Sequence, residues 1–219
     1  MEPSETTITL PGGESLGGTL ALPDQIRGAV LFAHGSGSSR FSPRNRAVAS
    51  TLNEAGFATL LMDLLTQNEE EAERHTGHLR FDVELLAQRL RIAIENLRET
   101  VPGPIGLFGA STGAAAALIA AAHEPESVSA VVSRGGRPDL AGDALPLVRA
   151  PTLLIVGELD TVVIELNEQA RRLMHATVEM KIVRGATHLF EEPGTLDEVS
   201  DLARAWFEGN LEPDRSARS

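Results

Sequence analysis

Ser111 stands at the centre of residues 109–113, which have the pattern G-x-S-x-G. The apolar residues 104–108 predict a buried strand before it, and the alanine-rich residues 114–122 predict a helix after it. A serine on so sharp a strand-to-helix turn stands above the sheet, and the flanking glycines relieve crowding there. Ser111 is therefore predicted to be a nucleophile. The alternative is a glycine-rich turn whose serine only caps the helix.

A serine hydroxyl needs a base to take its proton, and the base needs an acid to orient it. In open α/β sheets with this turn, the order along the chain is serine, acid, histidine. Asp160 follows the apolar run 152–156, and His188 follows the last predicted strand, residues 178–183. Each lies just beyond the carboxyl end of a predicted strand, where the active sites of such sheets form. We expect Asp160 and His188 to complete a triad with Ser111.

Other carboxylates compete for the acid role. Glu158 lies two residues before Asp160 and is the second choice. Asp139 and Asp143 follow the preceding predicted strand and are weaker candidates. A loop carboxylate is often only a helix cap or a solvated charge.

The oxyanion of an acyl-transfer intermediate requires backbone N–H donors. The turn after residues 28–33 reads His34-Gly-Ser36-Gly, and its glycines allow N–H groups to point inward. We expect the N–H groups of Ser36 and Thr112 to form the oxyanion hole. His34 follows the wrong strand for a base and is expected to be a structural hydrogen bonder.

Two further patterns could suggest a bound metal or nucleotide. His75 and His78 have i, i+3 spacing beside residues 69–73, but no third ligand is evident. The glycine pairs elsewhere lack the G-x-G-x-x-G or G-K-[ST] layout of nucleotide sites. No cofactor and no metal are expected.

Strand and helix signals alternate along the chain. Residues 6–10 and 16–22 predict an antiparallel hairpin, and the later strands are predicted at 28–33, 57–62, 104–108, 128–132, 152–156 and 178–183. Helices are predicted at 45–55, 81–100, 114–122, 163–174 and 195–207, with a charged stretch at 68–78. Continuous apolar strands alternating with amphipathic helices indicate an α/β fold with a mostly parallel sheet of about eight strands, covered on both faces.

The chain has 219 residues and no composition break, which predicts one domain over residues 1–219 with a polar, mobile tail at 208–219. Its net charge of −12 disfavours nucleic acid as a partner. It has no cysteine, no apolar run of membrane-spanning length and no signal-peptide pattern at its start. We expect a soluble cytoplasmic protein without a membrane partner, either a monomer or a small homo-oligomer.

The motif segments resemble those of the α/β-hydrolases, and more narrowly the dienelactone-hydrolase-like branch. The resembling segments are LFAHGSGSSRFSPRNRAVASTL, AGFATLLMDLLT, GLFGASTGAAAAL, PTLLIVGELDTVV and GATHLFEEPGTL. This branch includes hydrolase domains fused to phosphoribosyltransferases. The resemblance implies an α/β-hydrolase fold and hydrolysis. Authentic dienelactone hydrolases have a cysteine where this chain has Ser111, and this departure favours ordinary ester chemistry.

Only residues 133–151 separate two predicted strands where many α/β-hydrolases insert a helical cap. We therefore expect no cap domain and an open site, over which only residues 64–78 could lean. These features predict a serine carboxylesterase that cleaves small or exposed esters through an acyl-enzyme. An acyltransferase or perhydrolase with the same triad, and a non-catalytic binding protein of this fold, are the alternatives.

Overall fold

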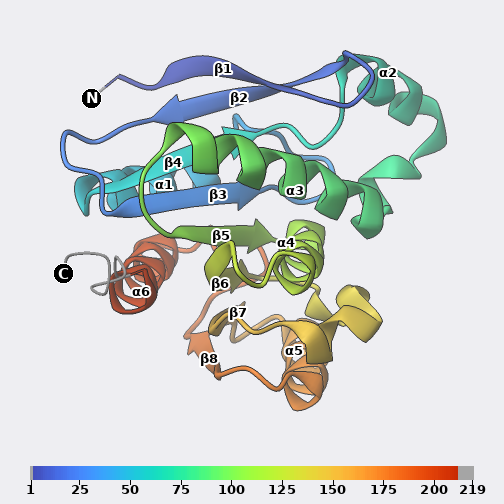
Figure 1. The fold of residues 1–219 in the computed structure, drawn as a ribbon. Helices are drawn as coiled ribbons and strands as arrows, with labels where there is room; N and C mark the ends of the chain where they lie inside the picture. The colour runs from blue at the N-terminus through green and yellow to red at the C-terminus, as the bar shows by residue number, and fades with distance from the viewer. Residues whose placement is uncertain (1, 212–219) are drawn as a thin grey trace.

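A computed structural model describes residues 2–211 of the chain, and within these residues eight strands form one sheet (Figure 1). Their order is β1-β2-β4-β3-β5-β6-β7-β8. The strands are β1 (Ser4–Thr9), β2 (Ser15–Ala21), β3 (Gly28–Ala33), β4 (Phe57–Met62), β5 (Ile105–Ala110), β6 (Val128–Arg134), β7 (Thr152–Gly157) and β8 (Val178–Val183). β1 and β2 pair antiparallel with each other and β2 with β4, whereas the remaining pairs are parallel. The predicted hairpin and mostly parallel sheet are confirmed.

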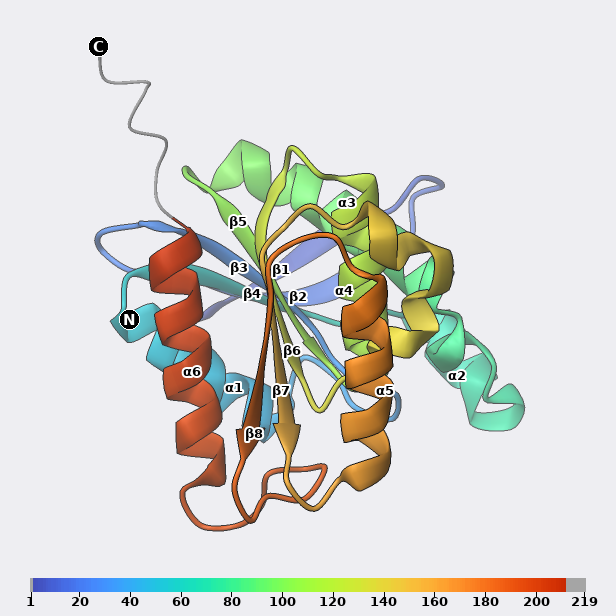
Figure 2. The same ribbon diagram turned by 90° about the horizontal axis from the view of Figure 1, so that it is seen from below.

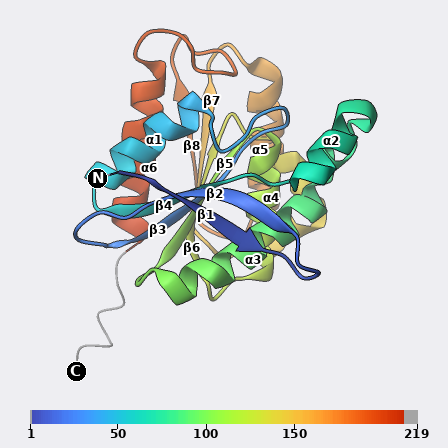
Figure 3. The same ribbon diagram turned by 90° about the horizontal axis from the view of Figure 1, so that it is seen from above.

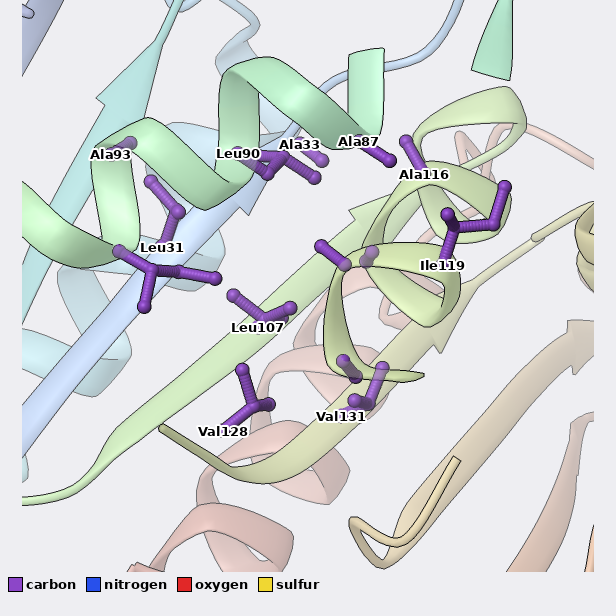
Figure 4. Close-up of a cluster of buried hydrophobic side chains, with 14 of the residues drawn as sticks. Leu31, Ala33, Ala87, Leu90, Ala93, Leu107, Ala116, Ile119, Val128 and Val131 are labelled. Atoms are coloured by element: carbon purple, nitrogen blue, oxygen red, sulfur yellow. The ribbon is translucent and has the colours of Figure 1, made fainter. Parts of the chain in front are cut away.

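Helices cover both faces of the sheet (Figure 2). One face carries α1 (Pro43–Glu54) and α6 (Thr195–Asn210), and the other carries α3 (Val83–Thr100), α4 (Thr112–His123) and α5 (Thr161–Leu173). Each layer has its own hydrophobic core. In Figure 4, side chains of α3 and α4 meet those of β3, β5 and β6 in one of these cores. Every residue of β3, β4, β5 and β7 is buried, as their continuous apolar sequences predict.

The predicted charged stretch before α3 is a helix, α2 (Gln67–Thr76), followed by the short 3₁₀ helix η1 (Leu79–Phe81). Figure 3 shows α2 projecting from the body of the molecule near the start of α3. The Thr66 side chain accepts from the Glu69 N–H, and the Glu69 carboxylate accepts from the Thr66 N–H. This capping box explains why a polar segment forms a helix. Gly77 ends it in the left-handed conformation, with φ of 66°.

The connection from β6 to β7 contains only the 3₁₀ segment η2 (Pro138–Leu147), which packs against α4 and α5. It spans residues 135–151 and is too short for a cap domain of the kind inserted at this point in many hydrolases. The carboxyl ends of the central strands are therefore not covered from this connection.

The C-terminal helix is longer than predicted. α6 continues through Asn210, so residues 208–210 are helical instead of belonging to a polar tail. Leu211 is fully buried, and its side chain packs with Phe207 over Gly106. This anchor explains the extra helical turn. The rest of the predicted tail, residues 212–219, lies outside the described residues.

Over residues 2–211, none of the helices combines the length and the apolar character that crossing a bilayer requires.

Phe207 tests how the α6 layer stabilises the fold. Its ring is fully buried, lies 6.4 Å from that of Phe57 and occupies the space that a Cβ at Gly106 would need. We expect Phe207→Ala to lower the free energy of unfolding by about 3–5 kcal/mol, because it leaves a cavity. Phe81→Ala removes the same kind of ring from a residue that is 57% exposed. It should change the free energy of unfolding by about 0.5 kcal/mol or less. Equal losses in urea unfolding would contradict this packing.

Candidate active site

Ser111 sits at the N-cap of α4, directly after β5, with φ of 51° and ψ of −123°. Positive φ is strained for a residue with a side chain, and it turns Ser111 away from the sheet. A Cβ at Gly109 would lie 2.4 Å from the Ala114 Cα, and one at Gly113 would lie 2.4 Å from the Ala33 carbonyl oxygen. Both glycines are therefore needed for this close approach of β5, α4 and the end of β3.

His188 and Asp160 form a hydrogen-bonded pair. The His188 Nδ1 lies 2.6 Å from the Asp160 Oδ2, and both side chains are partly buried. Because Nδ1–H donates to the carboxylate, the Nε2 of a neutral ring remains an acceptor. The structure thus brings together the predicted base and the predicted acid, although they are 28 residues apart.

Backbone contacts between the two loops align this pair. The Leu159 N–H donates to the Ala186 carbonyl at 2.9 Å, and the Glu158 N–H donates to the Val183 carbonyl at 3.0 Å. A Cβ at Gly157 would lie 2.5 Å from the Ala186 oxygen, so only glycine allows the loops to approach this closely. The loops after β7 and β8 therefore hold each other in place.

The competing carboxylates have other partners. The Glu158 carboxylate accepts from the Gly185 N–H at 2.8 Å, at the base of the histidine loop. Asp139 forms a two-point ion pair with Arg137. Asp143 is exposed in η2. Among these candidates, Asp160 is the one in contact with His188.

The turn at Gly135 lies between Ser111 and His188. The Ser111 N–H donates to the Arg134 carbonyl at 3.3 Å, and a Cβ at Gly135 would lie 3.6 Å from the His188 Cε1. The side-chain hydrogen bonds of residues 2–211 include none between the Ser111 hydroxyl and His188. Such catalytic hydrogen bonds are often long until substrate binds. The serine and the histidine pair thus flank one short glycine turn.

The predicted oxyanion donors are on adjacent segments, but one of them is engaged. The Ser36 N–H donates to the Thr112 Oγ1 at 2.9 Å, and Thr112 is buried. This bond holds the turn after β3 against the start of α4. A substrate oxyanion at this position would have to share or replace the threonine hydroxyl. The sequence did not reveal this contact.

His34 connects the turns after β3 and β4. Its Nδ1 donates to the Gly35 carbonyl at 2.9 Å, and its Nε2 accepts from the Leu64 N–H at 3.3 Å. Burial is the largest effect on the ring and lowers the pKa of His34. Its contacts are those of a neutral, structural histidine.

The loop after His188 contains a residue that no sequence pattern marked. Phe190 is buried and has φ of 55°, a conformation that is uncommon outside glycine. The guanidinium of the buried Arg134 lies 5.9 Å from its ring and donates to the Asn45 side chain. Burial and the neighbouring Arg44 charge lower the pKa of Arg134 to about 10. The buried Phe190 and Arg134 thus support the loop that carries His188 from inside the protein.

His75 and His78 lie at the end of α2 and just after it, remote in sequence from the triad candidates. In the part of the chain from residue 2 to residue 211, no three His, Asp or Glu side chains gather as a metal site.

A mostly parallel sheet with a serine turn after β5 and an Asp–His pair after β7 and β8 is the architecture of an α/β-hydrolase. The sequence model of the Dienelactone hydrolase family matches residues 16–208. The chain therefore belongs to the dienelactone hydrolase family, as its resemblance implied.

Known proteins resemble the chain over most of its length. A crystal structure of dienelactone hydrolase from Anabaena variabilis is 54% identical, with a TM-score of 0.92 and coverage of 97% of this chain and 100% of that one. The esterase domain of a Rhodothermus marinus protein is 23% identical, with a TM-score of 0.76 and coverage of 96% and 100%. This second likeness shows the fold alone.

Two Mycobacterium tuberculosis proteins, from strains CDC 1551 and H37Rv, carry a phosphoribosyl transferase name. Each is 54% identical over 211 residues, which cover 94% of this chain. The chain spans about half of their length, 46%. These relatives are consistent with the predicted resemblance to hydrolase domains fused to phosphoribosyltransferases.

The strain at Ser111 predicts an unusual order of stability. Both Ser111→Gly and Ser111→Ala remove the hydroxyl, but only glycine relaxes a backbone with positive φ. We expect Ser111→Gly to be more stable than Ser111→Ala by about 1 kcal/mol in urea unfolding. At the exposed helical residue Ser50 the order should reverse, because alanine is the better helix former. Ser111→Ala being as stable as Ser111→Gly would contradict the strained turn.

The lowered pKa of His34 predicts that the folded protein loses stability in mild acid. Because its pKa is lowered in the folded chain, the unfolded chain binds the proton more readily. The contribution of neutral His34 to the free energy of unfolding is complete above the ordinary histidine pKa of about 6.5, and it is lost as the pH falls below that value. We expect His34→Gln to flatten the decrease in unfolding free energy between pH 7 and pH 5, whereas a change of the exposed His175 to Gln should not. Parallel curves for wild type and His34→Gln would be the contrary result.

Proposed function

We propose that the chain is a serine carboxylesterase that hydrolyses small or exposed esters through an acyl-enzyme. The observation that carries this proposal is the 2.6 Å His188–Asp160 pair beside a serine on a strained strand-to-helix turn. A histidine oriented by a carboxylate and placed next to such a serine is the arrangement that activates a hydroxyl for attack.

Acylation begins with attack of the Ser111 Oγ on the ester carbonyl carbon. The His188 Nε2 takes the hydroxyl proton, and Asp160 stabilises the resulting imidazolium through Nδ1–H. The N–H groups of Ser36 and Thr112 bind the negative oxygen, and the Thr112 hydroxyl yields its place on Ser36. As the tetrahedral intermediate collapses, the bond to the alcohol oxygen breaks and His188 gives its proton to that oxygen.

Deacylation repeats these steps with water as the nucleophile. His188 removes a proton from the water, whose oxygen attacks the acyl carbon, and Ser111 leaves with that proton restored by His188. The products are a carboxylic acid and the free Ser111 hydroxyl. The residues named here supply each proton transfer, so the scheme requires no cofactor.

Steady-state hydrolysis of p-nitrophenyl butyrate tests these roles. Ser111→Ala should reduce kcat by about 10³-fold or more, and Asp160→Asn by about 10²–10⁴-fold, because the histidine loses its orienting charge. Glu158→Gln is the matched control: this carboxylate lies two residues from Asp160 but contacts Gly185, and its loss should change kcat by about threefold or less.

The outcome that contradicts the proposal is turnover by folded Ser111→Ala at the wild-type rate. An equal loss in Asp160→Asn and Glu158→Gln would remove Asp160 from the acid role. Transfer of the butyryl group to an added alcohol, in preference to water, would indicate an acyltransferase instead of an esterase.

A further inference from the structure

A cavity of about 210 Å³ lies between the turn after β3 and the segment formed by α2 and η1. Leu64, Leu65 and Leu86 supply much of its wall, so most of its lining surface is apolar. Leu64 and Leu65 follow β4, and Leu86 belongs to α3. The cavity is therefore built from elements on one side of the serine turn.

The cavity begins next to the serine. Gly35 and Ser36 line it, and a Cβ at Gly35 would lie 3.0 Å from the Ser111 Cβ and 3.7 Å from its Oγ. Ser36 also carries the proposed oxyanion donor. A carbonyl group held between Ser111 and Ser36 would thus stand at the entrance of the cavity.

The strand order decides which part of an ester faces this entrance. Ser111 follows β5, the cavity elements follow β3 and β4, and His188 and Asp160 follow β8 and β7. In the sheet, β3 and β4 lie on one side of β5, and β6, β7 and β8 lie on the other. The leaving alcohol must face His188 to receive its proton. The acyl group then extends in the opposite direction, toward the cavity.

Glu73 and Arg80 line the cavity on the side of α2 and η1. The buried carboxylate of Glu73 accepts hydrogen bonds from the Leu79 N–H at 2.6 Å and from the Arg80 Nε at 2.7 Å, which ties α2 to η1. Burial raises the pKa of Glu73, but the bonds from Arg80, Leu79 and Thr76 outweigh it and lower the pKa to about 2. The Glu73 carboxylate is therefore ionised at neutral pH, where its hydrogen bonds from Leu79 and Arg80 persist.

The same bonds determine the charge inside the cavity. The Arg80 guanidinium donates to the carboxylate and to the backbone carbonyl of Glu73. Glu70 adds a negative charge to the cavity lining. His34, which also lines the cavity, has the contacts of a neutral ring. A ligand with a free carboxylate would meet no uncompensated positive charge among these side chains.

We propose that this cavity is the acyl-binding site and that it selects short, uncharged acyl groups of about four to six carbons. The volume corresponds to about seven groups of water size, at roughly 30 Å³ each. Longer chains would exceed this volume. This inference rests on the proposed esterase function, which assigns Ser111 and His188 their roles.

A series of p-nitrophenyl esters from acetate to dodecanoate tests the length limit. We expect kcat/KM to rise about fourfold per added methylene up to butanoate or hexanoate, as apolar surface is buried. From octanoate onward it should fall, to about a tenth of the maximum or less at decanoate. A flat profile, or a steady rise to dodecanoate, would overturn the proposal.

Leu65 variants test whether the acyl group lies in this cavity. Leu65→Ala enlarges the cavity and should move the optimum by about two carbons to longer chains, whereas Leu65→Phe should move it to acetate. Leu173→Ala makes the same change on the exposed end of α5 and should leave the profile unchanged. In a second series of butyrate esters with different alcohols, none of these variants should alter the alcohol preference. A change in alcohol preference alone would place the leaving group, not the acyl group, in the cavity.

Ethyl hexanoate and monoethyl adipate test the charge selection, because both present six-carbon acyl groups and only the second has a free carboxylate. We expect kcat/KM for monoethyl adipate to be lower by about tenfold or more, and an equal or higher value would contradict the proposal.

Ser111→Ala, assayed in parallel, separates the two hypotheses. Absent ester turnover by wild type, or turnover that persists in Ser111→Ala, would refute the esterase function and this inference with it. Serine-dependent turnover with an unrestricted length profile would refute only the acyl site.

Discussion

The close backbone approach among β3, β5 and α4 is the constraint on which the rest of the site depends. Gly109 and Gly113 have no space for a Cβ, and they let the start of α4 meet the end of β3. This approach places Ser111 in its strained conformation and brings the Ser36 N–H to the Thr112 hydroxyl. A side chain at Gly109 would push α4 away from β5, and one at Gly113 would push α4 away from the turn that is proposed to bind the oxyanion.

The other half of the site is assembled by a second close approach, at Gly157. There the loop after β7 donates backbone hydrogen bonds to Val183 and Ala186, and His188 is aligned with Asp160. The two halves belong to strands on the same sheet, so the rigidity of a core buried on both faces fixes their separation. The segment from α2 to η1, by contrast, is held by side-chain contacts: the hydrogen bonds of Glu73 and the ion pair of Glu69 with Arg89 of α3.

Features that depend on local chemistry could be predicted from the sequence. Apolar runs predicted the strands, and the glycines around Ser111 and the positions of Asp160 and His188 after successive strands indicated a hydrolase site. Contacts that depend on three-dimensional packing could not be predicted, such as the Ser36–Thr112 bond or the support of Phe190 by Arg134. The α2 helix was missed although its capping box, Thr66 and Glu69, is visible in the sequence, because the polar composition outweighed that signal. The end of α6 was missed because the burial of Leu211 is a tertiary contact.

Activation of Ser111 as a nucleophile is the central claim, and covalent labelling measures it most directly. An alkyl fluorophosphonate reacts with a serine hydroxyl only when a neighbouring base has activated it. After incubation of the folded protein, mass spectrometry of its peptides should locate one phosphonyl group on Ser111, and Asp160→Asn should slow the labelling while Glu158→Gln does not. Folded protein that hydrolyses esters while Ser111 remains unlabelled would contradict the claim.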